Sequence, residues 1–204
     1  FEKRDDSTLY AETIPKLWDM PNEEARAVMQ QWTAFEPGLP NAVVVRNRIT
    51  CNRAPNDPWG PAIETAQEVP ACYFTRNFDQ FASYFGNNHW REETQDPGPP
   101  WGKAQPPLDA MACFNEDGQG IAIYSPTAGP TWNFGPHAAP TPNGPNDGPS
   151  VHIAPLSRVA LGPKSTYEYR YWLVTGAKPQ IAETLDALIQ EHAKEQPKLS
   201  NPTD

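Results

Sequence analysis

Residues 166–175 read TYEYRYWLVT, and this stretch decides the fold class. Tyr167, Tyr169 and Tyr171 alternate with Glu168 and Arg170, which is the two-residue period of a β-strand with one buried face. Residues 42–50, AVVVRNRIT, show a similar density of β-branched side chains in a bounded run. Two such strands in one chain favour a protein built from β-sheet.

The proline content points the same way. The chain has 25 prolines among 204 residues, more than twice the average share of about 5 %. Proline lacks the backbone donor and clashes inside a helix, so it collects in turns, loops and strand edges. The prolines concentrate at 55–70, 97–107, 126–149 and beyond 197, and we predict these stretches as loops. The fold class predicted is all-β, an antiparallel β-sandwich with long Pro-rich loops.

The remaining elements follow from local pattern. Residues 23–35 have two interpretations: a helix capped by Asn22, or a strand over 27–35 that turns at Pro37-Gly38 into the strand at 42–50; the hairpin accounts better for the Pro-Gly pair. Strands are also predicted at 8–14, 71–75, 150–154, 157–161 and 166–175, and a hairpin is predicted over 109–125. The chain is predicted to end with a helix at 179–194 and a flexible tail at 197–204. We expect a single domain over 1–204.

Charge and hydropathy exclude several classes of protein. The net charge is -9 and no basic block occurs, so the chain is a poor binder of nucleic acid or of an anionic membrane surface. No apolar run approaches the roughly 18–20 residues of a membrane span. Seven Trp, seven Tyr and eight Phe are more apolar side chains than a disordered chain carries. We therefore predict neither a nucleic-acid nor a membrane partner, and the oligomeric state stays open.

The cysteines and the first residues bear on the compartment. Cys51, Cys72 and Cys113 are odd in number and lack metal-type spacing, which favours buried thiols over one disulfide plus a spare thiol. Residues 1–6 hold no apolar segment of a signal peptide. We expect either a cytoplasmic protein or, more in keeping with the abrupt start, a mature or excised fragment.

Tryptophans in loop-like segments suggest a ligand surface. No nucleotide, metal or hydrolase motif occurs in the chain. Flat rings stack on the apolar faces of sugars while neighbouring amides and carboxylates bind the hydroxyls. The alternative is that these rings only pin the loops to the sandwich. The residues concerned are Trp59, Trp90, Trp101 and Trp132.

The segment 67–73, QEVPACY, supplies a candidate acid or base. Glu68 comes just before a short apolar strand and is fixed by Pro70. A carboxylate in this role needs a partner group. The alternative is a structural carboxylate that binds loop amides. The candidate partners are Asp79, Tyr84, His89 and His152.

Basic side chains add two further candidates. His89, Trp90 and Arg91 form one polar-aromatic patch. Arg46 and Arg48 share one face of a strand, where they either pair with acids or grip an anionic substrate. The histidines are scattered, so neither a metal site nor a cofactor is predicted, and a structural calcium ion is left open.

Several segments occur in an order typical of one group of proteins. They are QEVPACY at 67–73, NEDGQGIAIYSP at 115–126, IAP at 153–155 and YEYRYWLVTG at 167–176. The chain resembles largely uncharacterised, mostly secreted bacterial proteins with a mutarotase-like β-supersandwich, an architecture similar to that of galactose mutarotases, polysaccharide lyases and sandwich domains of glycoside hydrolases. The resemblance implies all or part of a supersandwich, a secreted or periplasmic location and a polysaccharide or oligosaccharide ligand near Glu68 and Tyr73.

These observations lead to one functional prediction with alternatives. The first is a glycoside hydrolase acting on a neutral polysaccharide, with Glu68 as acid or base, His89 or Asp79 as its partner, and Trp90, Trp101 and Trp132 as stacking platforms. The alternatives are a non-catalytic carbohydrate-binding module or lectin, and a structural β-domain of a larger enzyme. A polysaccharide lyase would instead use Arg46, Arg91, Tyr84 and His89.

Overall fold

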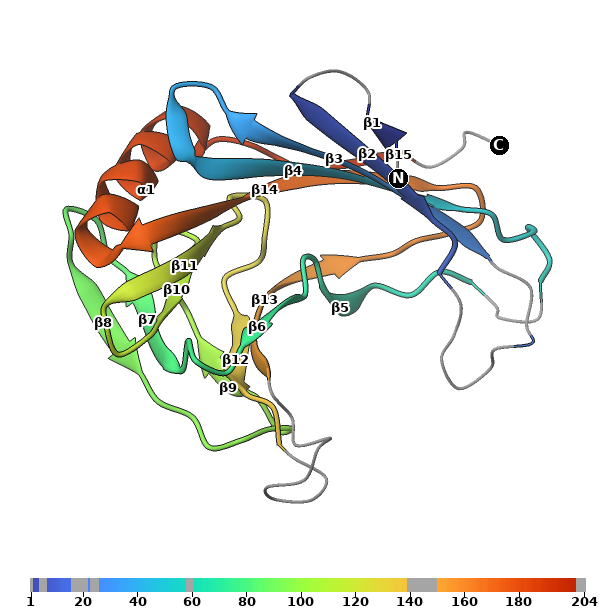
Figure 1. The fold of residues 1–204 in the computed structure, drawn as a ribbon. Coiled ribbons are helices and arrows are strands. Elements are labelled where there is room, and N and C mark those ends of the chain that lie inside the picture. Colours follow the sequence, from blue (N-terminus) through green and yellow to red (C-terminus); the bar gives the residue numbers. More distant parts are fainter. Residues whose placement is uncertain are drawn as a thin grey trace.

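The chain forms two antiparallel sheets and one helix (Figure 1), as the computed structural model shows. The residues described are 2–3, 7–15, 22, 26–57, 61–138 and 150–200. Within these ranges no helix has the length and apolar character that crossing a membrane requires. The all-β antiparallel sandwich with one C-terminal helix is thereby confirmed.

The larger sheet has ten strands in the order β1-β2-β3-β4-β14-β11-β10-β7-β8, with β15 paired to β14. These strands are β1 (Glu2–Lys3), β2 (Thr8–Thr13), β3 (Ala27–Glu36), β4 (Leu39–Cys51), β7 (Gln80–Tyr84), β8 (Trp90–Glu93), β10 (Ala110–Phe114), β11 (Gln119–Tyr124), β14 (Thr166–Ala177) and β15 (Lys198–Ser200). The sheet curves strongly, so it has a hollow side and an outer side (Figure 1).

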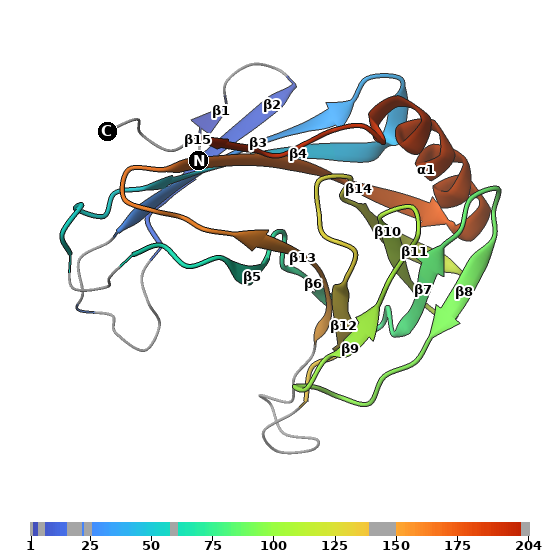
Figure 2. The same cartoon turned by 180° about the vertical axis from the view of Figure 1, so that it is seen from behind.

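The smaller sheet has five strands and lies in the hollow of the larger one (Figure 1). Its order is β5-β13-β12-β9, with β6 also paired to β13. The strands are β5 (Thr65–Glu68), β6 (Cys72–Thr75), β9 (Gly102–Ala104), β12 (Trp132–Pro136) and β13 (Ser150–Val159). The helix α1 (Lys178–His192) lies on the outer side of the larger sheet, as the reverse view in Figure 2 also shows.

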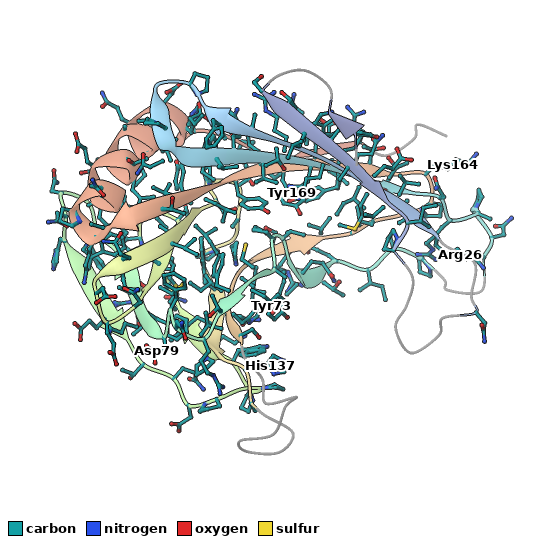
Figure 3. The ribbon with its side chains drawn as sticks, viewed as in Figure 1. Arg26, Tyr73, Asp79, His137, Lys164 and Tyr169 are labelled. Atoms are coloured by element: carbon teal, nitrogen blue, oxygen red, sulfur yellow. The ribbon has the colours of Figure 1, made fainter. Side chains whose placement is uncertain are left out.

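Strand β14 divides its side chains between two hydrophobic cores. Tyr167, Tyr169 and Tyr171 point into the core between the two sheets, where Figure 3 labels Tyr169. Trp172 and Val174 point the other way, into the core under α1. The predicted alternation of this strand is confirmed, and it explains why so many aromatic side chains can be buried along one strand.

Both predicted hairpins are confirmed. Strand β3 pairs with β4 throughout, so residues 27–35 are a strand and not part of a helix. Gly38 takes a φ of 77° in the turn between them. Strands β10 and β11 meet around Gly118, whose φ is 71°. Both turns need a positive φ that glycine adopts without steric cost.

Several loop and boundary predictions are wrong. Strands β5, β9 and β12 lie inside stretches predicted as loops, β13 is continuous where two strands were expected, and β15 lies in the tail predicted as flexible. Helix α1 also starts and ends earlier than predicted. These strands have weak local signals because strand formation depends on the neighbours that pair with them. Residues 139–149 of the Pro-rich stretch 126–149, and residues 201–204 of the tail, lie outside the described residues.

The three cysteines behave as small hydrophobic side chains. Cys51, Cys72 and Cys113 are buried and free, which confirms buried thiols over a disulfide. Burial raises the pKa of the Cys72 thiol to about 12 and also raises that of Cys113. Thiols held in their protonated form are poor nucleophiles, so they serve packing.

Candidate functional site

The candidate site lies on the face of the smaller sheet that points away from the core. Period-two alternation turns the neighbours of the site residues, such as Phe74 and Ile153, inward. Tyr73 is directly opposite His152 across β6 and β13. Asn133 on β12 is opposite Lys103 on β9 and next to β13. Pairing of strands far apart in the chain therefore gathers these polar side chains on one surface.

His152 is enclosed between two aromatic rings. The ring of Tyr73 stacks on it, with centroids 4.8 Å apart and planes 26° apart. The ring of Trp101 lies 4.4 Å away and also contacts His137 at 5.4 Å. His152 is fully buried, whereas Tyr73 is 54 % exposed. Figure 3 shows Tyr73 and His137 on the same side of the molecule. The result is an aromatic wall whose outer ring meets solvent.

Glu68 ends β5 beside this wall. Its Oε1 accepts a hydrogen bond of 2.6 Å from Asn133 Nδ2, and Asn133 Oδ1 in turn accepts one from Lys103 Nζ. Glu68 Oε2 lies 3.3 Å from His152 Nε2, without the geometry of a hydrogen bond. The Glu68 side chain is 30 % exposed. The carboxylate is therefore held from one side and open to a ligand from the other.

The protonation states of its neighbours follow from burial. Burial lowers the pKa of His152, and the Glu68 carboxylate only partly offsets this effect. The imidazole is therefore neutral at neutral pH, and its contact with Glu68 is not an ion pair. Burial, aided by the charge of Glu68, raises the pKa of Tyr73. The phenol thus keeps its proton, and the carboxylate has only uncharged aromatic neighbours.

A glycine makes room for Trp101 in this wall. Gly135 is opposite His152 on β12 and has a φ of 140°, which side chains rarely adopt. A Cβ there would lie 2.8 Å from Gln95 Cγ and 3.8 Å from the Trp101 ring. The bare backbone lets Gln95 and Trp101 cross the strand, and Trp101 thereby reaches His152.

The structure brings together three of the predicted site residues: Glu68, Tyr73 and Trp101. Of the four predicted partners of Glu68, only His152 contacts it. Asp79 is exposed just before β7, and Figure 3 shows it apart from Tyr73. His89 is exposed in the turn between β7 and β8, so the prediction that it joins Glu68 is wrong.

The rest of the predicted patch around His89 has structural partners. Trp90 is half-buried and packs its ring on Tyr84 and Phe114. Arg91 Nη2 forms an ion pair of 2.7 Å with Glu93. Because β8 is the outermost strand of the larger sheet, this patch lies on a different sheet from Glu68.

Two predicted site residues are core residues. Tyr84 is fully buried, and its hydroxyl donates a hydrogen bond of 2.7 Å to Asp186 on α1. Trp132 is also fully buried, between the sheets, which corrects its assignment as a stacking platform. Its loop-like surroundings concealed β12, whose alternation turns Trp132 inward and Asn133 outward. Trp59 lies outside the described residues.

The two arginines of β4 lie on the outer side of the larger sheet. Arg48 forms an ion pair of 2.7 Å with Glu168, as the sequence favoured. Arg46 is exposed and lies far from the Glu68 surface, since it shares its face with α1. Among the described residues, no three His, Cys, Asp or Glu side chains are grouped so that they could hold a metal ion.

Sequence reasoning missed Asn133 and Lys103. Their segments are rich in proline, glycine and asparagine and were predicted as loops. The signal that could have found Asn133 is the triplet Trp132-Asn133-Phe134, in which a polar residue alternates with large apolar ones.

Comparisons with known proteins bear on the fold. No family model and no curated protein matches the sequence. A candidate aldose 1-epimerase from Escherichia coli K12 is similar in structure, with a TM-score of 0.52, 12 % identity and coverage of 86 % of this chain and 67 % of that one. A galactose mutarotase related enzyme from Lactobacillus acidophilus has a TM-score of 0.45 and 5 % identity, covering 87 % of this chain and 70 % of that one. The first likeness identifies a galactose-mutarotase-like β-sandwich.

Proposed function

We propose that this chain is a carbohydrate-active enzyme in which Glu68 exchanges a proton with a sugar bound on the outward face of the smaller sheet. The observation that carries the proposal is the Glu68 carboxylate, partly exposed beside an exposed aromatic ring and held by Asn133. General bases of this kind must be positioned by other groups and still reach the substrate.

The surroundings of Glu68 suit a sugar. The exposed ring of Tyr73 offers a flat apolar surface for the C–H face of a pyranose. The exposed Lys103 and the partly exposed Glu68 supply a donor and an acceptor for its hydroxyls. Apolar rings with a few placed polar groups are typical of small-molecule sites.

The partners of Glu68 favour one class of reaction. They are an amide and a neutral imidazole, not a second carboxylate. Ring opening of a free sugar needs only one carboxylate: Glu68 takes the proton of the C1 hydroxyl, the C1–O5 bond breaks, and the Tyr73 phenol or a water molecule gives a proton to O5. Hydrolysis of a glycosidic bond usually needs two carboxyl groups about 5–9.5 Å apart. We therefore place interconversion of sugar anomers before polysaccharide cleavage. The name of the Escherichia coli neighbour, aldose 1-epimerase, denotes chemistry of this kind.

Glu68→Gln tests the proposal. The unsubstituted protein should accelerate the interconversion of α- and β-D-galactose or D-glucose, followed by polarimetry. Glu68→Gln keeps the shape but removes the base, so the rate should fall about 10²- to 10⁴-fold. The matched control is Glu92→Gln, an exposed carboxylate on β8, and it should leave the rate unchanged.

The same variants separate the other functions. Reducing ends released from a neutral polysaccharide, and lost in Glu68→Gln, would replace ring opening by the hydrolysis that the sequence predicts. Retention on polysaccharide resin without turnover would make the chain a binding module. The absence of both turnover and retention would refute a carbohydrate function. It would also remove the support for the secreted or periplasmic location that we propose with that function.

A further inference from the structure

A cavity lies on the outer side of the larger sheet, facing away from Glu68. Its volume is about 1000 Å³. Trp32 on β3, Arg46 on β4 and Arg170 on β14 form part of its lining, and His192 and Glu195 lie at the end of α1. A cavity of this volume is at the upper limit of small-molecule sites, so it has room for more than one sugar ring.

Arginines line this cavity on two neighbouring strands. Arg46 is directly opposite Trp32 on one side and Arg170 on the other. Arg170 Nε donates a hydrogen bond of 2.6 Å to Glu195, and Arg48 is paired with Glu168. Within the described ranges, Arg46 has neither an ion pair nor a side-chain hydrogen bond. After burial, the charge of Arg46 is the main cause that lowers the pKa of Arg170. One guanidinium group in the cavity is thus left uncompensated.

His192 supplies an independent sign of a ligand. Its side chain is 9 % exposed and stacks on Trp172 with centroids 4.5 Å apart. Its Nδ1 lies 3.0 Å from Glu195 Oε1. Its Nε2 has no hydrogen-bond partner among the described residues, and the nearest carboxylate, Glu191, is 3.8 Å away. A buried polar atom without a partner is costly, so a ligand atom at this place would be stabilising.

We propose that this cavity binds a carboxylate-bearing saccharide, with the carboxylate on Arg46 and a sugar hydroxyl on His192 Nε2. The planar guanidinium group matches a carboxylate with two parallel hydrogen bonds. Trp32 adds an aromatic ring, a group of the kind that sugars contact, to the lining.

The charge of the lining favours one carboxylate over a phosphate group. The cationic side chains are Arg46, Arg48, Arg170 and Lys198, and the acidic ones are Glu36, Glu168, Glu191 and Glu195. The lining is therefore balanced and has no net attraction for a group with two or three charges, whereas Arg46, unpaired in the described part of the chain, matches a single carboxylate. The cavity is independent of the Glu68 surface, so the proposal stands whether or not Glu68 is catalytic.

Isothermal titration calorimetry with trigalacturonate tests the proposal. We expect saturable binding that is at least tenfold weaker in Arg46→Gln, because the carboxylate loses both charged hydrogen bonds of the guanidinium group. Binding should also weaken several-fold in His192→Phe, which keeps the ring on Trp172 but lacks Nε2. The matched control is Arg158→Gln, a 66 % exposed arginine on the other sheet, and it should bind like the unsubstituted protein.

Neutral and inorganic probes complete the test. Maltotriose should bind at least tenfold more weakly than trigalacturonate, and inorganic phosphate should not compete with it. No binding of trigalacturonate, equal binding of maltotriose, displacement by phosphate, or unchanged affinity in Arg46→Gln would each overturn the proposal. Thermal unfolding of each variant shows that the fold is retained.

Discussion

Two buried histidines, His152 on the smaller sheet and His192 at the end of α1, have similar surroundings. His152 stacks on Tyr73 and lies beside Glu68, and His192 stacks on Trp172 and lies beside Glu195. Burial lowers the pKa of both imidazoles. The two sites differ in the group that binds the carboxylate: the guanidinium group of Arg170 binds Glu195, whereas the amide of Asn133 binds Glu68.

The group that binds each carboxylate determines what that carboxylate can do. The Arg170 guanidinium group binds Glu195 through a hydrogen bond and an ion pair, which makes Glu195 a structural group. The Asn133 amide orients Glu68 without cancelling its charge, and the carboxylate stays available as a base. The same pair of residue types thus forms an ion-paired contact at the end of α1 and a partly exposed carboxylate on the smaller sheet.

Replacing the tryptophan next to each histidine by alanine should reveal the largest difference in stability between the two sites. Trp172 is fully buried and donates a hydrogen bond of 2.6 Å to Glu36, so Trp172→Ala should lower the free energy of unfolding by about 3–5 kcal/mol. Trp101 is half-buried, and Trp101→Ala should cost only about 1–2 kcal/mol. Urea unfolding measures both, and equal losses would mean that the two surroundings do not differ as described.

Asn133→Leu sharpens the role of the amide partner. We expect the sugar reaction to slow about tenfold, because Glu68 loses the hydrogen bond that positions it. The loss should fall on kcat and leave KM nearly unchanged, because the exposed ring of Tyr73 that would contact the sugar is untouched. Asn41 provides the control, because it binds Thr175 and Thr184 beside α1. Asn41→Leu should lower stability and leave kcat in place; an unchanged kcat in Asn133→Leu would count against a positioning role.

The pH dependence of stability is the smallest expected effect. The pKa of both histidines is lowered on folding from an ordinary value of 6.5. Below that pH the unfolded chain takes up protons that the folded chain does not, so the free energy of unfolding falls as the pH drops from about 7 to 5. His152→Phe and His192→Phe should each make this fall shallower. Urea titrations at pH 7 and pH 5 measure this change in the free energy of unfolding. An identical change in the unsubstituted protein and in both variants would contradict the prediction.

The site could be predicted only in part from the sequence. The segment 67–73 identified Glu68 and Tyr73 because a carboxylate and an aromatic ring flank one short strand. His89 and Trp132 were misplaced because their polar and Pro-rich neighbours describe composition, whereas the face of a sheet on which a residue lies depends on pairing. Asn133 was missed for the same reason, since β12 becomes a strand only between β9 and β13.

The sequence by itself determined the class of fold. The signals were local: the density of β-branched residues in β4, the period-two alternation in β14, the glycines at the two hairpin turns and the helical spacing of residues in α1. Local sterics and hydropathy are enough to produce them. The tertiary structure alone decided which histidine meets Glu68, which tryptophan is buried and which arginine is left without an acid. These depend on contacts between strands many residues apart, and local sequence does not encode them.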